Sequence, residues 1–173
     1  EMKLSPEVNL IAVAHYLHAK GHRRLGVISG DDERARRRAE AFREAAHLLG
    51  LPDVQMAFVP TPTSLQLGRN GLTELLRKRR RLDAVFCSSD LLALGVSTEA
   101  RVRGLAMPGQ LAVVGFGDLE FAAALEPALS SVRINAAAIG IQAAQFIVDR
   151  AEGREVPQRV VDIGFSIVER ASA

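Results

Sequence analysis

Short apolar runs alternate along this chain with longer segments in which apolar residues recur at helical spacing, and this alternation restricts the fold more than any other feature. The apolar runs predict strands over 25–29, 54–59, 84–87, 111–116, 131–134 and 160–168. The longer segments predict helices over 34–48, 65–79, 90–103 and 136–151, after a first helix that begins at Ser5-Pro6 and ends at Gly21. Such alternation is typical of α/β proteins, and we predict a doubly wound, mostly parallel sheet.

The composition is that of one globular domain. The chain has 173 residues, 48% of them hydrophobic and 24% charged, and its single cysteine excludes an internal disulfide. Its 22 basic and 20 acidic residues nearly cancel, which gives no reason to expect binding to a membrane or to nucleic acid. No apolar run approaches the roughly 20 residues that span a bilayer. The N-terminus has no recognisable secretory signal and begins with Glu1 rather than Met, so we expect a cytoplasmic fragment of a longer protein.

Polar residues or glycine follow several of the predicted strands. The turns are Gly30-Asp31-Asp32, Ser88-Ser89-Asp90 and Gly117-Asp118, and each leads from a strand into the next connection. In open parallel sheets, ligands lie beyond the carboxyl ends of the strands, where helix N-termini favour anions. Arginines at positions 34 and 36–38 follow the first turn and can bind a carboxylate. The sequence therefore predicts a polar cleft that accepts negative charge, with simple helix capping by Asp32, Ser89 and Asp90 as the alternative.

Other polar motifs give weaker indications. The basic run 77–81 stands where a helix is predicted to end, and a solvated helix end explains it better than nucleic acid does. The four histidines show no metal-ligand spacing. Cys87 lies in an apolar strand, and we expect it to be packed rather than reactive. Neither a nucleophile elbow nor a glycine-rich phosphate loop is recognisable, so we expect no catalysis, no metal and no cofactor.

Several segments resemble the effector-binding core of the lactose-repressor (LacI) family. Residues 21–30 resemble its GHRRIAxIxG motif, and 86–95 resemble FxxNDxxAxG. Residues 111–118 resemble VSVVGFDD, 126–132 resemble xPxLTTV, and 167–170 resemble the terminal LVxR. Each match is modest by itself, but together they occur in the family's order over nearly the whole chain.

The resemblance implies a two-lobed, periplasmic-binding-protein-like core in which each lobe is a three-layer αβα sandwich. On this interpretation residues 1–132 form the C-terminal lobe. Residues 133–157 belong to the N-terminal lobe, and 158–173 return to the C-terminal lobe. The family's helix-turn-helix headpiece, which binds operator DNA, is expected to be absent from this chain.

The resemblance also assigns effector-binding residues. The arginine that binds the effector in this family corresponds to Arg38. The asparagine that binds ligand hydroxyl groups corresponds to Ser89, and the aspartate beside it corresponds to Asp90. The first aspartate of the GFDD turn has become Gly117, whereas Asp118 is retained. The aromatic residue that closes over many ligands of the family lies near Thr63 in this chain, so we expect no stacking ring at that position.

These departures favour an anionic effector. Loss of a carboxylate at position 117 while Arg38 is kept makes a desolvated cleft more favourable for negative charge. The GFGD turn and the ending 162–166 look most like the gluconate-utilisation repressors of the family. We therefore predict a sugar acid, such as gluconate or a ketogluconate, as the effector.

The predicted function is the effector-sensing and dimerising part of a bacterial transcriptional repressor, without enzymatic activity. Leu92, Val96 and Val102 place apolar residues on more than one side of the helix 91–103, which predicts a symmetric homodimer. Burial of these residues in the protein's own core is the alternative. An exported solute-binding protein for a sugar-like ligand, or a small doubly wound enzyme, are the competing functions.

Overall fold

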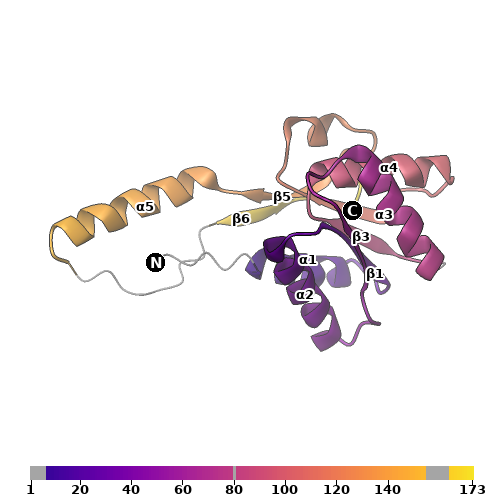
Figure 1. Cartoon of the computed structure of the whole chain (residues 1–173), viewed down its shortest axis with the longest axis horizontal. Coiled ribbons are helices and arrows are strands. Elements are labelled where there is room, and N and C mark those ends of the chain that lie inside the picture. Colours follow the sequence, from indigo (N-terminus) through magenta and orange to yellow (C-terminus); the bar gives the residue numbers. More distant parts are fainter. Residues whose placement is uncertain (1–6, 80, 155–163) are drawn as a thin grey trace.

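A computed structural model describes residues 7–79, 81–154 and 164–173 (Figure 1). The described strands form one sheet in the order β2-β1-β3-β4-β5-β6. Their bounds are β1 Leu25–Gly30, β2 Gln55–Val59, β3 Ala84–Cys87, β4 Ala112–Phe116, β5 Ser130–Ile134 and β6 Phe165–Val168. All neighbouring pairs are parallel except β5 and β6, which are antiparallel. The mostly parallel sheet predicted from the alternation is therefore confirmed.

The main helices cover both faces of this sheet. The covering helices are α1 Val8–Ala19, α2 Glu33–Leu48, α3 Leu65–Lys78 and α4 Asp90–Val102, whereas α5 Ala136–Ala151 lies away from the sheet (Figure 1). Helices α1 and α2 pack on one face and α3 and α4 on the other, which confirms the doubly wound, three-layer arrangement (Figure 1). A short 3₁₀ helix, Glu120–Ala124, was not predicted. The predicted cap at Ser5-Pro6, the start of the last predicted strand and the boundary near residue 157 lie outside the described residues.

Alternation along the central strands divides the core between the two faces. Val27 and Phe86 pack with α1 and α2, whereas Ile28 and Val85 pack with α3 and α4. Strands that are buried on both faces need apolar residues at every position, which explains the continuous apolar runs in the sequence. Cys87 is fully buried, and this burial raises the pKa of its thiol, so its predicted packing role is confirmed.

Close contact between α3 and α4 depends on two glycines. A Cβ atom added at Gly95 would lie 2.0 Å from the carbonyl oxygen of Leu65, and one added at Gly68 would lie 2.2 Å from that of Leu92. Backbone therefore packs against backbone at this crossing. Helices α3 and α4 therefore lie side by side on one face of the sheet, and Leu92 and Val96 of α4 are fully buried there.

This burial corrects part of the dimer prediction. Leu92 and Val96 belong to the protein's own core, because α3 covers the side of α4 that carries them. The exposed apolar residues of this region are Val102 (68% exposed), Leu91 and Leu119.

Helix α5 stands apart from the sandwich. Strand β5 leads out to it and β6 returns, so that the helix lies well away from the sheet (Figure 1). Ile141 and Ile147 on this helix are 73% and 70% exposed. An apolar helix with such exposure has not buried its hydrophobic surface within the described residues.

Candidate functional site

The polar turns predicted from the sequence meet at the carboxyl edge of the sheet. The backbone N–H of Gly30, at the end of β1, donates to the Ser88 hydroxyl 3.0 Å away, just after β3. The hydroxyl oxygens of Thr63 and Ser89 lie 3.0 Å apart. Parallel β1, β3 and β4 end side by side, so their following turns share one edge of the sheet, as is usual for ligand sites in this class of fold.

Asp32 and Ser89 cap the helices that begin at this edge. Asp32 accepts a hydrogen bond from the backbone N–H of Ala35 at 2.9 Å, and Ser89 accepts one from that of Leu92 at 3.2 Å. The capping alternative is therefore confirmed for these two residues. Ser89 is only half-buried, and it also contacts Thr63, so its hydroxyl still faces the edge of the sheet.

Arg38 brings positive charge to the same edge from α2. Its guanidinium lies 4.5 Å from the ring centroid of Phe116, at the end of β4. Burial, followed by repulsion from Arg34, lowers the pKa of Arg38, although Asp32 acts in the opposite direction. Its Nε is buried and has no hydrogen-bond partner among the described residues. A buried charged donor without an acceptor is costly, and a ligand carboxylate is one group that would remove this cost.

Asp90 has a role inside the protein. Its side chain is fully buried and accepts hydrogen bonds from the backbone N–H of Leu119 at 2.6 Å and from the Ser131 hydroxyl at 2.7 Å. The side-chain capping bond of α4 is made by Ser89, so the capping alternative is wrong for Asp90. Asp90 therefore joins the start of α4 to the corner after β4 and to β5, and its predicted contact with an effector stays a prediction.

The corner after β4 has a left-handed backbone. Gly117 has a φ of +116° and Asp118 a φ of +50°. Such conformations favour glycine and tolerate aspartate, so backbone geometry gives a second reason for glycine at position 117. The consequence for the edge is unchanged, because position 117 contributes no carboxylate.

Two arginines neutralise the one carboxylate of this corner. Asp118 Oδ1 lies 2.7 Å from Arg170 and Oδ2 lies 2.6 Å from Arg133. Burial alone would raise the pKa of Asp118, but the hydrogen bonds and charges of Arg170 and Arg133 outweigh it and hold the pKa below its ordinary value. These partners were not predicted, and the only sequence signal was the place of Arg170 in the terminal LVxR-like segment.

The carboxylates of this edge are engaged within the protein, Asp90 with two neutral hydrogen-bond donors and the others with arginines or a helix cap. Asp31 pairs with Arg36 at 2.6 Å, Asp32 caps α2, and Asp118 is paired twice. Arg38 is a half-buried cation whose buried Nε has no acceptor in the described part of the chain.

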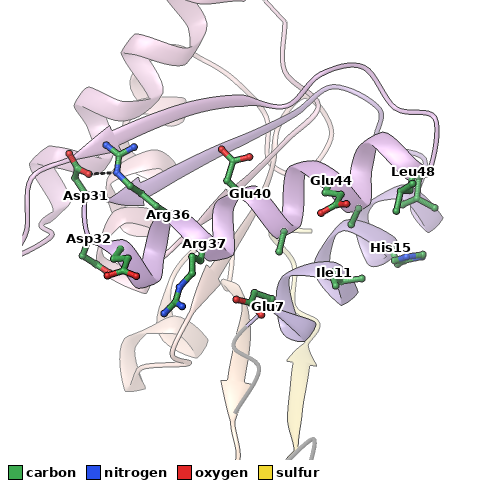
Figure 2. Close-up of a pocket in the computed structure, with 14 residues that line it drawn as sticks. Glu7, Ile11, His15, Asp31, Asp32, Arg36, Arg37, Glu40, Glu44 and Leu48 are labelled. Carbon is green, nitrogen blue, oxygen red and sulfur yellow. Dashed lines mark hydrogen bonds and ion pairs between the residues drawn. The ribbon is translucent and has the colours of Figure 1, made fainter. Parts of the chain in front are cut away.

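A separate hollow lies between α1 and α2 (Figure 2). Its volume is about 1080 Å³, and its floor includes Ile11 and Leu48. Asp31 and Asp32 reach one end of it, but Arg38 and Ser89 do not line it. None of the predicted effector residues lines this hollow.

The described residues contain neither a membrane-spanning helix nor a metal site. No helix there is long and apolar enough to cross a membrane. No group of three or more histidine, cysteine or acidic side chains is placed to hold a metal ion in those ranges.

Comparison with known proteins identifies one family. Residues 14–173 match the family of periplasmic binding protein-like domains. The chain is 38% identical over 163 residues to the HTH-type transcriptional regulator GntR of Pseudomonas aeruginosa, covering 93% of this chain and 48% of that protein. It is 32% identical over 146 residues to the regulator IdnR of Escherichia coli K12, covering 84% and 44%. The chain thus spans about half the length of the curated relatives it matches.

Solved structures of transcription regulators also superpose on this chain. The transcription regulator GntR of Chromobacterium violaceum superposes with a TM-score of 0.85 at 33% identity, over 99% of this chain and 64% of that one. A LacI-family regulator of Silicibacter pomeroyi superposes with a TM-score of 0.81 at 26% identity, over 98% and 62%.

Proposed function

Since the chain belongs to the periplasmic binding protein-like domain family, in the form found in LacI-family transcription regulators, we propose that it is the effector-sensing part of a DNA-binding repressor. The similarity to regulators over most of this chain supports the proposal. Operator DNA would be bound by a headpiece outside this chain, and the protein would act in the cytoplasm without catalysing a reaction.

We propose that the effector is a small sugar acid such as gluconate or a ketogluconate. The observation that carries this proposal is the buried Nε of Arg38 at the carboxyl edge of the sheet, which has no hydrogen-bond partner among the residues that the structure describes. A planar guanidinium held over Phe116 presents its N–H groups in a fixed direction, which suits a carboxylate. Ser89 and the backbone of the Gly117 corner would contribute hydrogen bonds to the hydroxyl groups of the ligand.

We propose that this chain supplies one lobe of the binding cleft. Residues 1–132 and 158–173 would form that lobe, and α5, within 133–157, would pack on the sheet of the second lobe. The separation of α5 from the sandwich and the exposure of Ile141 and Ile147 support this division (Figure 1). A ligand that contacts both lobes would change the angle between them and so the spacing of paired headpieces.

Exposed apolar residues on and beside α4 support a homodimer. Leu91, Val102 and Leu119 are exposed apolar residues; the first two lie at opposite ends of α4, and Leu119 lies just before the 3₁₀ helix. A symmetric dimer would bury them against a second copy.

The test is isothermal titration of gluconate into the intact regulator and into two arginine variants. We expect Arg38→Met to weaken binding by about 30-fold or more, because a charge-assisted contact is lost. Arg37→Met is the matched control, since Arg37 lies on the same helix but lines the hollow beside α1. Equal affinity of the Arg38→Met variant and the wild type would overturn the proposal.

A further inference from the structure

The carboxylate of Asp118 joins three segments that are distant in the sequence. Asp118 follows β4, Arg133 is part of β5, and Arg170 follows β6. Arg133 approaches Oδ2 with Nε at 2.7 Å and with its NH2 nitrogen at 2.6 Å, and Arg170 donates to Oδ1 at 2.7 Å. Arg170 also donates to the carbonyl oxygen of Leu129, just before β5, at 2.7 Å.

A second set of hydrogen bonds fixes the backbone of the same corner. The N–H of Asp118 donates to the Ser131 hydroxyl at 3.0 Å, and that hydroxyl donates to Oδ1 of buried Asp90 at 2.7 Å. Oδ2 of Asp90 accepts from the N–H of Leu119 at 2.6 Å. The corner is therefore bonded through both its side chain and its backbone to β5.

The strands that Asp118 holds are those that carry α5. Strands β5 and β6 form an antiparallel ribbon, with Val132 opposite Ile167 and Ile134 opposite Phe165, and α5 lies beyond the end of this ribbon (Figure 1). Any tilt of the ribbon against β4 moves Arg133 and Arg170 relative to Asp118. The Asp118 side chain is only 6% exposed, so separation from both arginines would leave a buried, unpaired carboxylate, which is strongly unfavourable.

We propose that Asp118 is a positioning residue that couples the Gly117 corner to the β5–β6 ribbon. This inference rests on the proposed function, in which the Gly117 corner contacts the effector. A ligand that shifts the corner then shifts the ribbon and α5 with it, through the two arginines. Asp118 thereby acts on the effector response without being a ligand of the effector.

Hydrogen–deuterium exchange on the 173-residue chain without ligand tests the coupling independently of the effector. Asp118→Asn is expected to raise exchange rates about tenfold at the amides of residues 131–134 and 165–168, with smaller changes in α3. Arg133→Gln removes only Arg133, the more exposed of the two arginines that pair with Asp118, and is expected to raise the exchange rates less. This second variant keeps the test valid if Asp118→Asn does not fold. Asp31→Asn is the matched control, because Asp31 pairs with Arg36 at the same edge but does not contact the ribbon.

The inference would be overturned if both Asp118→Asn and Arg133→Gln showed wild-type amide exchange rates at the ribbon. A uniform increase in exchange rates over the whole sheet would also overturn it. A second readout is gluconate affinity of the intact regulator. We expect Arg133→Gln to change it by about threefold or more while Arg38 is intact, a range usual for residues that modulate coupling. Failure of the wild-type regulator to bind gluconate would reject the proposed function alone, since the exchange results do not depend on a ligand.

Discussion

The guanidinium of Arg38 lies 4.5 Å from the ring centroid of Phe116, so the second helix and the fourth strand meet at the edge where the effector is proposed to bind. This contact holds a cation in place while its Nε has no protein acceptor in the described part of the chain. In this respect Arg38 differs from the carboxylates of the edge, which have charged partners or hydrogen-bond partners within the described residues. Asp31 and Asp118 are both engaged with arginines.

Loss of the Phe116 ring should weaken effector binding without removing the charge. Phe116→Leu is expected to lower gluconate affinity about three- to tenfold, because Arg38 loses the surface that orients it. Titration calorimetry on the intact regulator measures this. Phe58→Leu is the control, since the Phe58 ring lies beneath Arg36, 4.3 Å from its guanidinium. Equal losses in the two variants would contradict the role of Phe116.

Gly95 should tolerate no side chain. Gly95→Ala is expected to lower the free energy of unfolding by about 2–4 kcal/mol, because the new Cβ would meet the Leu65 carbonyl and force α3 and α4 apart. Urea denaturation followed by circular dichroism measures the change. Gly109→Ala is the control, since a Cβ there meets nothing within 4 Å among the described residues. A stable Gly95→Ala variant would show that the helix crossing is looser than described.

Asp118 should make the protein sensitive to acid. The pKa of Asp118 is lower in the folded chain than in the unfolded one, so its contribution to stability is present above the unfolded value of about 4 and is lost as the pH falls through the folded value. Asp118→Asn should therefore have a lower free energy of unfolding than the wild type at pH 7. The difference between the two proteins should become smaller below about pH 4. Thermal denaturation between pH 7 and pH 3 measures this difference. A difference that does not depend on pH would contradict the ion-pair role.

The exposed end of α4 should mediate dimer formation. Val102→Asp is expected to convert the dimer of the intact regulator into a monomer, because it places a charge in the proposed apolar interface. Analytical ultracentrifugation measures the assembly state. Leu48→Asp is the control, since Leu48 is 80% exposed but lies on α2, on the opposite face of the sheet. Dimers of unchanged stability in the Val102→Asp variant would argue against this interface.

Local patterns in the sequence predicted most of the fold. The apolar runs located the described strands, and Gly21, Gly50 and Gly104 marked helix ends, where each adopts a positive φ. Asp32 and Ser89 were recognisable as caps because capping depends only on the neighbouring turn. The shared edge of the polar turns followed from the common direction of parallel strands, whereas Arg38 was singled out from its neighbouring arginines only by the family resemblance.

Contacts between distant segments were not predictable in the same way. The pairing of Asp118 with Arg133 and Arg170 depends on the left-handed corner after β4 and on the antiparallel register of β6, which no local pattern reports. Similarly, the burial of Leu92 and Val96 follows from the close approach of α3 at Gly68 and Gly95. Apolar residues on several sides of a helix do not distinguish burial by a neighbouring helix from burial by a second subunit.

The most direct measurement is a paired titration of gluconate and glucose into the intact regulator at one pH and one ionic strength. The two ligands share most of their hydroxyl groups, but only gluconate carries a carboxylate for the Nε of Arg38, which has no acceptor within residues 7–79, 81–154 and 164–173. We predict that gluconate binds at least about tenfold more tightly than glucose, which corresponds to about 1.4 kcal/mol. Equal affinities, or tighter binding of glucose, would contradict it.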